Sequence, residues 1–186
     1  MKSTALPPPK GRMLLHSCCA PCSGTVIERL KEQVSITLYY ANPNIHPAAE
    51  YTKRLGELER WCRDTINIPL IVPPYNPTQW FQRVAGLEHE PEKGERCTQC
   101  YALRLEETAR YAAEHGYDSF STVLSISPHK DATRINALGT ALGEQFTIPF
   151  YQANFKKEGG FQRSLVISRE NNFYRQTYCG CIYSQR

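Results

Sequence analysis

Residues 13–32, MLLHSCCAPCSGTVIERLKE, decide the fold: a short apolar run is followed by a cysteine-rich turn and then by a helical pattern that begins at a proline. Residues Met13 to His16 are typical of a short buried strand. Proline is favoured in the first turn of a helix, so we expect a helix from about Pro21 to Glu32. The cysteines therefore lie where a strand ends and a helix begins.

The same order of strand and helix recurs along the chain. Alternation of this kind favours an α/β fold with a parallel sheet. Further strands are expected at 34–40, 69–72, 119–124 and 148–150, and further helices at 47–65, 78–84, 97–115 and 131–142. We predict a flexible N-terminal segment over residues 1–11. A single catalytic domain over residues 12–186 should be Rossmann-like, with a mostly parallel sheet of about five strands flanked by helices.

Length and composition exclude several classes of protein. With 186 residues the chain can bury a sizeable core, so its eight cysteines are not needed as the disulfide framework of a small secreted domain. Pro7, Pro8 and Pro9 interrupt the place where a signal peptide would have an apolar run. No stretch approaches the ~20 apolar residues of a membrane span. We therefore expect no membrane association and a cytoplasmic protein, whose thiols stay reduced unless they bind a metal or cycle.

Basic residues alternate with aromatic ones toward the end of the chain. The formal net charge is modest, +4 from 22 Lys and Arg against 18 Asp and Glu. Cations bind phosphates and aromatic rings stack on bases, so a mixed surface of this kind suits RNA. Ordinary solvated charge is the alternative explanation. The candidate RNA contacts are Lys156, Lys157 and Arg175.

Chemically unusual segments come directly after the predicted strands. They are residues 17–22, 41–47, 125–130 and 154–157, which carry cysteine, proline, histidine and lysine. In an open parallel sheet, ligands bind at the edge formed by the carboxyl ends of the strands. We expect these segments to converge on that edge.

Seven of the eight cysteines form three clusters that are far apart in the sequence. The clusters are His16-Ser-Cys18-Cys19-Ala-Pro-Cys22, Cys97-Thr-Gln-Cys100 and Cys179-Gly-Cys181. One metal ion or cluster usually has four protein ligands, so seven thiols leave a surplus for redox chemistry. The eighth, Cys62, lies on the apolar face of its predicted helix and is expected in the core.

Spacing alone favours an iron-sulfur cluster over zinc. Only Cys97 and Cys100 form a clean Cys-x-x-Cys pair, although Cys19 and Cys22 could form a second. The adjacent pair Cys18-Cys19 suits a cluster with several iron corners better than a single ion. Cys97 and Cys100 begin a helix, where backbone N–H groups stabilise thiolates.

The Cys179-Gly-Cys181 pair differs from the other two clusters. A disulfide there would close a very small ring, and strained disulfides are easily reduced and often catalytic. Glycine tolerates the turn that such a ring requires. The pair could equally provide two more metal ligands.

These clusters resemble the QueH family of epoxyqueuosine reductases, together with Tyr40-Ala-Asn-Pro-Asn-Ile-His46-Pro, Ile126-Ser-Pro-His129-Lys130, Phe155-Lys-Lys157 and Tyr174-Arg-Gln-Thr-Tyr178. The resemblance implies the last step of queuosine synthesis. In that step the epoxide on the cyclopentane ring of epoxyqueuosine, at the wobble position in the anticodon stem-loop of certain tRNAs, is reduced to an alkene.

The resemblance also implies a HUP-like fold and a cobalamin-free mechanism with a [4Fe-4S] cluster and a second metal ion, iron. It assigns the cluster to Cys18, Cys19, Cys97 and Cys100, and Cys22 to the second metal. Cys179 and Cys181 are then the redox-active pair.

The chemistry needs two electrons, two protons and an external electron donor. A dithiol that closes to a disulfide supplies electrons in pairs, whereas a [4Fe-4S] cluster passes them singly. His129 is the candidate acid for the departing oxygen, with Lys130 and Tyr178 as further candidates.

A zinc-bound RNA-binding module without turnover is the alternative function. An ATP-dependent enzyme is less well supported, because cysteines occupy the place of a Gly-rich phosphate loop.

Overall fold

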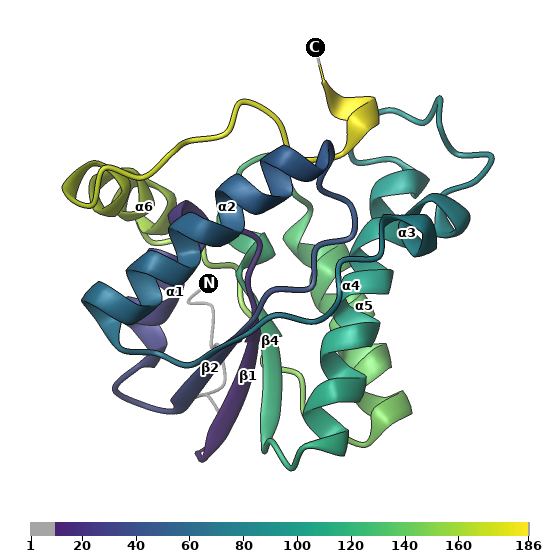
Figure 1. The fold of residues 1–186 in the computed structure, drawn as a ribbon. Helices are drawn as coiled ribbons and strands as arrows, with labels where there is room; N and C mark the ends of the chain where they lie inside the picture. Colours follow the sequence, from purple (N-terminus) through teal and green to yellow (C-terminus); the bar gives the residue numbers. More distant parts are fainter. Residues whose placement is uncertain (1–9, 186) are drawn as a thin grey trace.

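A parallel sheet lies at the centre of the computed structural model, which describes residues 10–185 (Figure 1). Its four strands in this part of the chain are β1 (Arg12–His16), β2 (Ser35–Tyr39), β3 (Leu70–Ile71) and β4 (Ser119–Thr122), in the spatial order β3-β2-β1-β4. β1 is central, and its Leu15 pairs with Leu38 on one side and Ser121 on the other. The predicted α/β class with a parallel sheet is confirmed.

The prediction of about five strands was too high for the described residues. Where residues 148–150 were expected to form a strand, the structure has a single parallel bridge between Phe120 and Phe150. Two backbone hydrogen bonds hold it, from Phe120 N to Pro149 O at 3.0 Å and from Tyr151 N to Phe120 O at 2.9 Å. Pro149 has no N–H group, so this stretch cannot continue the ladder.

Helices cover both faces of the sheet (Figure 1). On one side, α1 (Ala20–Leu30) packs against α6 (Gly160–Glu170) and α2 (Ala48–Trp61). On the other side, α4 (Glu95–Glu114) packs against α5 (Ala132–Phe146) and α3 (Pro77–Arg83). Short helices follow α2 (Cys62–Ile66) and β4 (Val123–Ile126) and precede the C-terminus (Ile182–Ser184). The sequence did not predict α6, whose apolar pattern is short and begins at two glycines.

The core lies between the sheet and these helices. Met13, Leu14, Leu15, Leu38 and Phe120 have no exposed surface, so β1 is buried on both faces as its apolar run predicts. Cys62 is buried in the same core, as expected. No helix within residues 10–185 combines the length and apolar character needed to cross a membrane.

The carboxyl edge of the sheet is the upper edge in the view of Figure 1. The turn before α1, the loop of residues 40–47 after β2 and the short helix after β4 all begin there. The chain after α6, drawn in yellow, runs across this edge to the C-terminus. At the other end of the chain, the predicted flexible segment 1–11 lies outside the described residues except for Lys10 and Gly11.

Gly160, the first residue of α6, has no room for a side chain. A Cβ atom there would lie 1.8 Å from the carbonyl oxygen of Phe155. We expect Gly160→Ala to lower the free energy of unfolding by about 1–3 kcal/mol, because the backbone must move apart. Gly56→Ala in α2 is the matched control: its Cβ would meet nothing within 4 Å, and alanine should raise that free energy by about 0.5–1 kcal/mol. Urea unfolding measures both, and equal stability of the two variants would contradict this close contact.

Candidate metal and redox site

The three cysteine clusters converge on the carboxyl edge of the sheet, where the sequence predicts the first of them. Cys18 and Cys19 follow β1, and Cys97 and Cys100 lie in the first two turns of α4. Cys179 and Cys181 lie in the irregular chain after α6, residues 171–185, which we call the C-terminal segment. All of these cysteines are free thiols.

Cys18, Cys19 and Cys22 form a close trio. Their sulfur atoms lie within 4.8 Å of one another, with 3.7 Å between Cys18 and Cys19. Within residues 10–185, no other set of three or more His, Cys, Asp or Glu ligand atoms is this close. Hydrogen bonds from the thiols of Cys19 and Cys22 hold the pKa of Cys18 well below its ordinary value, whereas burial raises the pKa of Cys19 to about 12. The thiolate form of Cys18 suits a soft metal ion.

Two cavities adjoin the cysteines. The outer cavity has a volume of about 300 Å³, and its wall includes Cys22, His129, Lys130, Arg175 and Cys179. The second, which we call the thiol cavity, is smaller and is lined by four cysteines: Cys97, Cys100, Cys179 and Cys181. Cys179 and Lys130 line both cavities. These two residues therefore form part of the wall between them.

The structure brings the four predicted cluster ligands to one edge but divides them between two groups. Cys18 and Cys19 lie together in the trio with Cys22. Cys97 and Cys100 instead face the thiol cavity. Any centre that uses all four must therefore lie between the trio and the first turns of α4.

Two cations lie near both groups of thiols. Arg104 of α4 is only 3% exposed, lines the thiol cavity and donates from Nε to the carbonyl oxygen of Cys100 at 3.0 Å. Burial alone would lower the pKa of Lys130, but the negative charges at Cys18, Cys179 and Cys22 outweigh it and raise that pKa. Because positive charge stabilises thiolates, these cations favour the form of sulfur that binds metals.

Trp80 of α3 carries an unpaired hydrogen-bond donor and lies beside the thiols. It is fully buried and lines the thiol cavity, and its Nε1 has no hydrogen-bond partner within the described part of the chain. A buried N–H group without a partner is costly. Sulfur bound to iron accepts such hydrogen bonds, which tune the potential of the metal. Thiol ligands, nearby cations and an unpaired donor together fit a metal-sulfur centre.

The turn between Cys179 and Cys181 requires glycine. Gly180 has φ +104°, and a Cβ atom there would lie 2.8 Å from Cγ1 of Ile45. A hydrogen bond from the Cys181 thiol lowers the pKa of Cys179 despite its burial, and the charge of Lys130 lowers it further. The same hydrogen bond, together with burial, raises the pKa of Cys181. These opposite shifts favour a thiolate at Cys179 over one at Cys181.

The histidines have different settings. His129 is exposed at the outer cavity. His16 is fully buried, its ring nitrogens lie 2.9 Å from Thr122 Oγ1 and 3.1 Å from Ala41 O, and burial lowers its pKa to about 4. His46 packs against the rings of Trp80 and Phe81. The contacts of His16 and His46 are those of structural residues.

The predicted RNA contacts differ in their relation to the outer cavity. Arg175 is exposed and forms part of its wall, and Lys157 is also exposed. Lys156 is half-buried, and its Nζ donates to the carbonyl oxygen of Lys130 at 2.7 Å. Lys156 therefore also holds the loop that carries His129 and Lys130.

Three residues of the site were not predicted from the sequence. They are Arg54, Arg104 and Trp80, all buried. Arg104 follows Cys100 by four residues, and this helical spacing was a signal that could have indicated a shared face. Arg54 and Trp80 depend on contacts between distant segments, for which the sequence carries no local signal.

Comparisons with known proteins place the chain in a family. The model of the family described as epoxyqueuosine reductase QueH matches residues 13–186. A protein of that name from Haemophilus influenzae is 45% identical over 183 residues, which covers 97% of this chain and 74% of that protein. Another of that name, from Thermotoga maritima, is 33% identical over 177 residues, which covers 94% of this chain and 90% of that protein.

A solved structure is similar in fold. It is described as a predicted subunit of tRNA methyltransferase from Methanocaldococcus jannaschii, with a TM-score of 0.56 and 12% sequence identity. The match covers 85% of this chain and 76% of that chain. At this level of identity the likeness concerns the fold alone.

The pKa directions predict an order of thiol reactivity in metal-free protein. Because the thiolate is the nucleophile, we expect iodoacetamide at neutral pH to modify Cys179 before Cys181 and Cys97, whose pKa values are raised. Peptide mass spectrometry over time measures the order. Cys62, buried in the core with a pKa raised by burial to about 11, is the internal control and should react more slowly than Cys179. Faster reaction of Cys181 than Cys179 would contradict the assigned thiolate.

Proposed function

Because this chain belongs to the epoxyqueuosine reductase QueH family, we propose that it reduces epoxyqueuosine to queuosine in tRNA, with Cys179 and Cys181 as the immediate electron donors. The enzyme is an oxidoreductase of queuosine biosynthesis. A zinc-bound RNA-binding module without turnover is not favoured, since the relatives are named as reductases. A tRNA substrate makes the cytoplasm the proposed location.

One observation carries the proposal: Cys179 lines both the outer cavity and the thiol cavity. The outer cavity, at about 300 Å³, has the size of a small-molecule site and suits one nucleotide turned out of the anticodon loop. Cys181 lies behind Cys179, in the thiol cavity with Cys97 and Cys100. One thiol of the pair can thus meet the substrate while the other faces the residues that could hold a metal.

The electrons of the reaction balance with this pair alone. Both C–O bonds of the epoxide break, a C=C bond forms, and the oxygen leaves as water with two protons. The two electrons come from Cys179 and Cys181, whose sulfur atoms join as a disulfide. The Cys181 thiol gives up one proton, and a proton donor of the outer cavity supplies the other. A one-electron carrier, acting twice, returns the pair to the dithiol.

The proposed ligands of a [4Fe-4S] cluster are Cys18, Cys19, Cys97 and Cys100, and Cys22 is assigned to a second metal ion, iron. The burial of Cys18, Cys19 and Cys100 and the nearby charge of Arg104 support the assignment. Such a cluster supplies single-electron transfer when bound, which suits a one-electron carrier as the external donor. Arg104 and Lys130 offset the negative charge that several thiolates bring together.

Two residues of the outer cavity are proposed to handle protons. The raised pKa of Lys130 keeps its ammonium charged, so it can stabilise or protonate the departing oxygen. His129, exposed at the same cavity, is the second proton donor. The hydroxyl of Tyr178 donates to the carbonyl oxygen of His46, which gives it a structural role.

Cysteine variants of three kinds test the function. Alanine at Cys18, Cys19, Cys97 or Cys100 removes a proposed ligand and should abolish bound iron, sulfide and activity after anaerobic purification. Alanine at Cys179 or Cys181 should leave iron content and visible spectrum intact while activity is lost, because no disulfide can form. Cys62→Ala is the matched control and should keep both the bound iron and sulfide and the activity.

Three results of this experiment would count against the proposal. Full iron and sulfide in all four ligand variants would refute the ligand set. Loss of the cluster in the Cys179 and Cys181 variants would make that pair a metal site. Stoichiometric zinc without iron in the active wild-type protein would refute the [4Fe-4S] cluster.

The RNA interface is proposed at Lys156, Lys157 and Arg175. Charge removal at Lys157 and Arg175 should weaken tRNA binding and reduce the slope of log K against log salt by about 0.7–0.9 per lost phosphate contact. Lys156→Ala should also weaken binding and, through its contact with the loop of residues 127–131, slow turnover. Lys31→Ala, at the end of α1 remote from the carboxyl edge, is the matched control. Unchanged salt dependence in the Lys157 and Arg175 double variant would move the interface to another face.

A further inference from the structure

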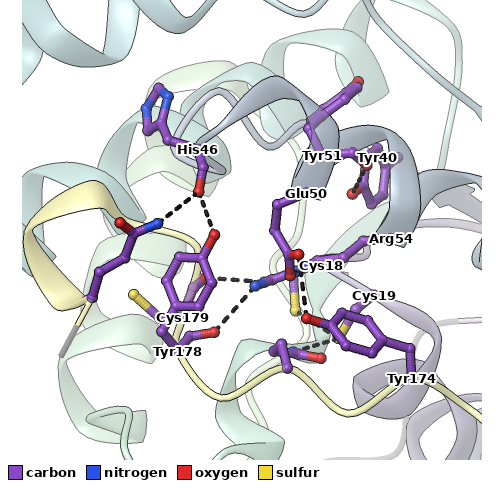
Figure 2. A network of polar contacts seen from close by, with 12 residues as sticks. Cys18, Cys19, Tyr40, His46, Glu50, Tyr51, Arg54, Tyr174, Tyr178 and Cys179 are labelled. Carbon is purple, nitrogen blue, oxygen red and sulfur yellow. Dashed lines mark hydrogen bonds and ion pairs between the residues drawn. The ribbon is translucent and has the colours of Figure 1, made fainter.

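The C-terminal segment carries Cys179 and Cys181 across the carboxyl edge without regular structure of its own. Between the end of α6 and the short helix at Ile182–Ser184 it contains neither helix nor strand. Its buried backbone groups must therefore find partners elsewhere in the protein. The partners come from α2 and from the loop before it (Figure 2).

One face of α2 supplies most of these partners. Glu50, Arg54 and Glu57 are spaced by four and three residues, so they lie on the same face of the helix. Glu57 accepts a hydrogen bond from Tyr174 N at 2.6 Å, and Glu50 accepts one from the Tyr174 hydroxyl at 3.3 Å. An amphipathic helix normally has apolar residues on its buried face. The polar residues on this face of α2 therefore serve to bind the C-terminal segment.

Arg54 lies at the centre of this face and is only 2% exposed. Its Nε donates to Glu50 at 2.7 Å, and its two terminal nitrogens donate to the carbonyl oxygens of Tyr178 at 3.2 Å and Cys179 at 3.3 Å. Figure 2 shows the guanidinium reaching from α2 to both carbonyl groups. The rigid fork of arginine can bond two acceptors at once, which lysine cannot reproduce.

The other side of the turn is held by the loop after β2. His46 N donates to the carbonyl oxygen of Gly180 at 2.8 Å, and the Tyr178 hydroxyl donates to the carbonyl oxygen of His46. A Cβ atom at Gly180 would lie 2.8 Å from Ile45 and 3.3 Å from Nη1 of Arg54. Three consecutive carbonyl groups, those of residues 178 to 180, are thereby fixed from two directions.

We infer that Arg54 is a positioning residue that holds the Cys179–Cys181 pair in its reactive arrangement at the wall between the two cavities. It acts through the carbonyl groups of Tyr178 and Cys179, to which its terminal nitrogens donate. The inference rests on the proposed function only in that this pair is the electron donor. Its structural part, that Arg54 sets the arrangement of the two thiols, can be tested in protein without tRNA.

The test compares Arg54→Lys and Arg54→Met with wild type. Arg63→Met is the matched control, because Arg63 is exposed, follows the same helix and pairs only with Asp64. We expect kcat to fall by on the order of tenfold or more in Arg54→Met and less in Arg54→Lys, with KM for tRNA within about twofold of wild type. Iron content should not change.

A second readout uses the protein alone, equilibrated with reduced and oxidised glutathione. Without the hydrogen bonds from Arg54, the turn can adopt a backbone conformation that is more favourable for the ring closed by a Cys179–Cys181 disulfide. The dithiol-disulfide equilibrium should therefore shift toward the disulfide in both Arg54 variants but not in Arg63→Met. If Arg54→Met does not fold, the result for Arg54→Lys alone tests the inference, because lysine keeps the positive charge that pairs with Glu50. Wild-type kcat and wild-type thiol equilibrium in folded Arg54→Lys would overturn the inference. Full activity of Cys179→Ala would instead overturn the proposed function, while the glutathione equilibrium would still test the role of Arg54.

Discussion

The hydrogen bonds from Arg54 to the carbonyl groups of Tyr178 and Cys179 are the interaction on which the site depends. A segment without regular structure normally lies at the surface, where water satisfies its backbone. Here the C-terminal segment packs against the carboxyl edge of a parallel sheet. The buried ion pair of Arg54 and Glu50 on α2 forms the hydrogen bonds that water would otherwise make with its backbone. Hydrogen bonds to charged donors contribute about 1.5–3 kcal/mol each, enough to fix a turn of this length. Together with the bonds from the loop after β2, they hold Cys179 between the two cavities.

The parallel sheet explains why the other groups meet at the same place. β1 is buried between β2 and β4, so the three loops that follow these strands emerge side by side. The cysteine trio follows β1, His46 belongs to the loop after β2, and Lys130 follows β4. The start of α4 adds Cys97, Cys100 and, one turn later, Arg104. Clustered thiolates repel one another, and the charges of buried Arg104 and half-buried Lys130 offset that repulsion.

The sequence alone predicted those structural features that depend on neighbouring residues. Apolar runs such as Met13–Leu15 predicted the strands, and Pro21 marked the first turn of α1. The place of Cys18, Cys19 and Cys22 at the carboxyl edge also followed, because they come directly after a predicted strand. The missing fifth strand depended on Pro149 and on pairing across 30 residues, which local propensity does not reveal. Arg54 was missed for the same kind of reason, since its acceptors lie 124 and 125 residues away in the chain.

The central claim is that Cys179 and Cys181 deliver both electrons, and a single turnover tests it most directly. Fully reduced enzyme, freed of external reductant under anaerobic conditions, is mixed with an equimolar amount of tRNA that contains epoxyqueuosine. Peptide mass spectrometry then counts the disulfide, and nucleoside analysis counts the alkene product. The account predicts one Cys179–Cys181 disulfide for each queuosine formed, appearing in step with it. Product formed while both thiols remain free would contradict it.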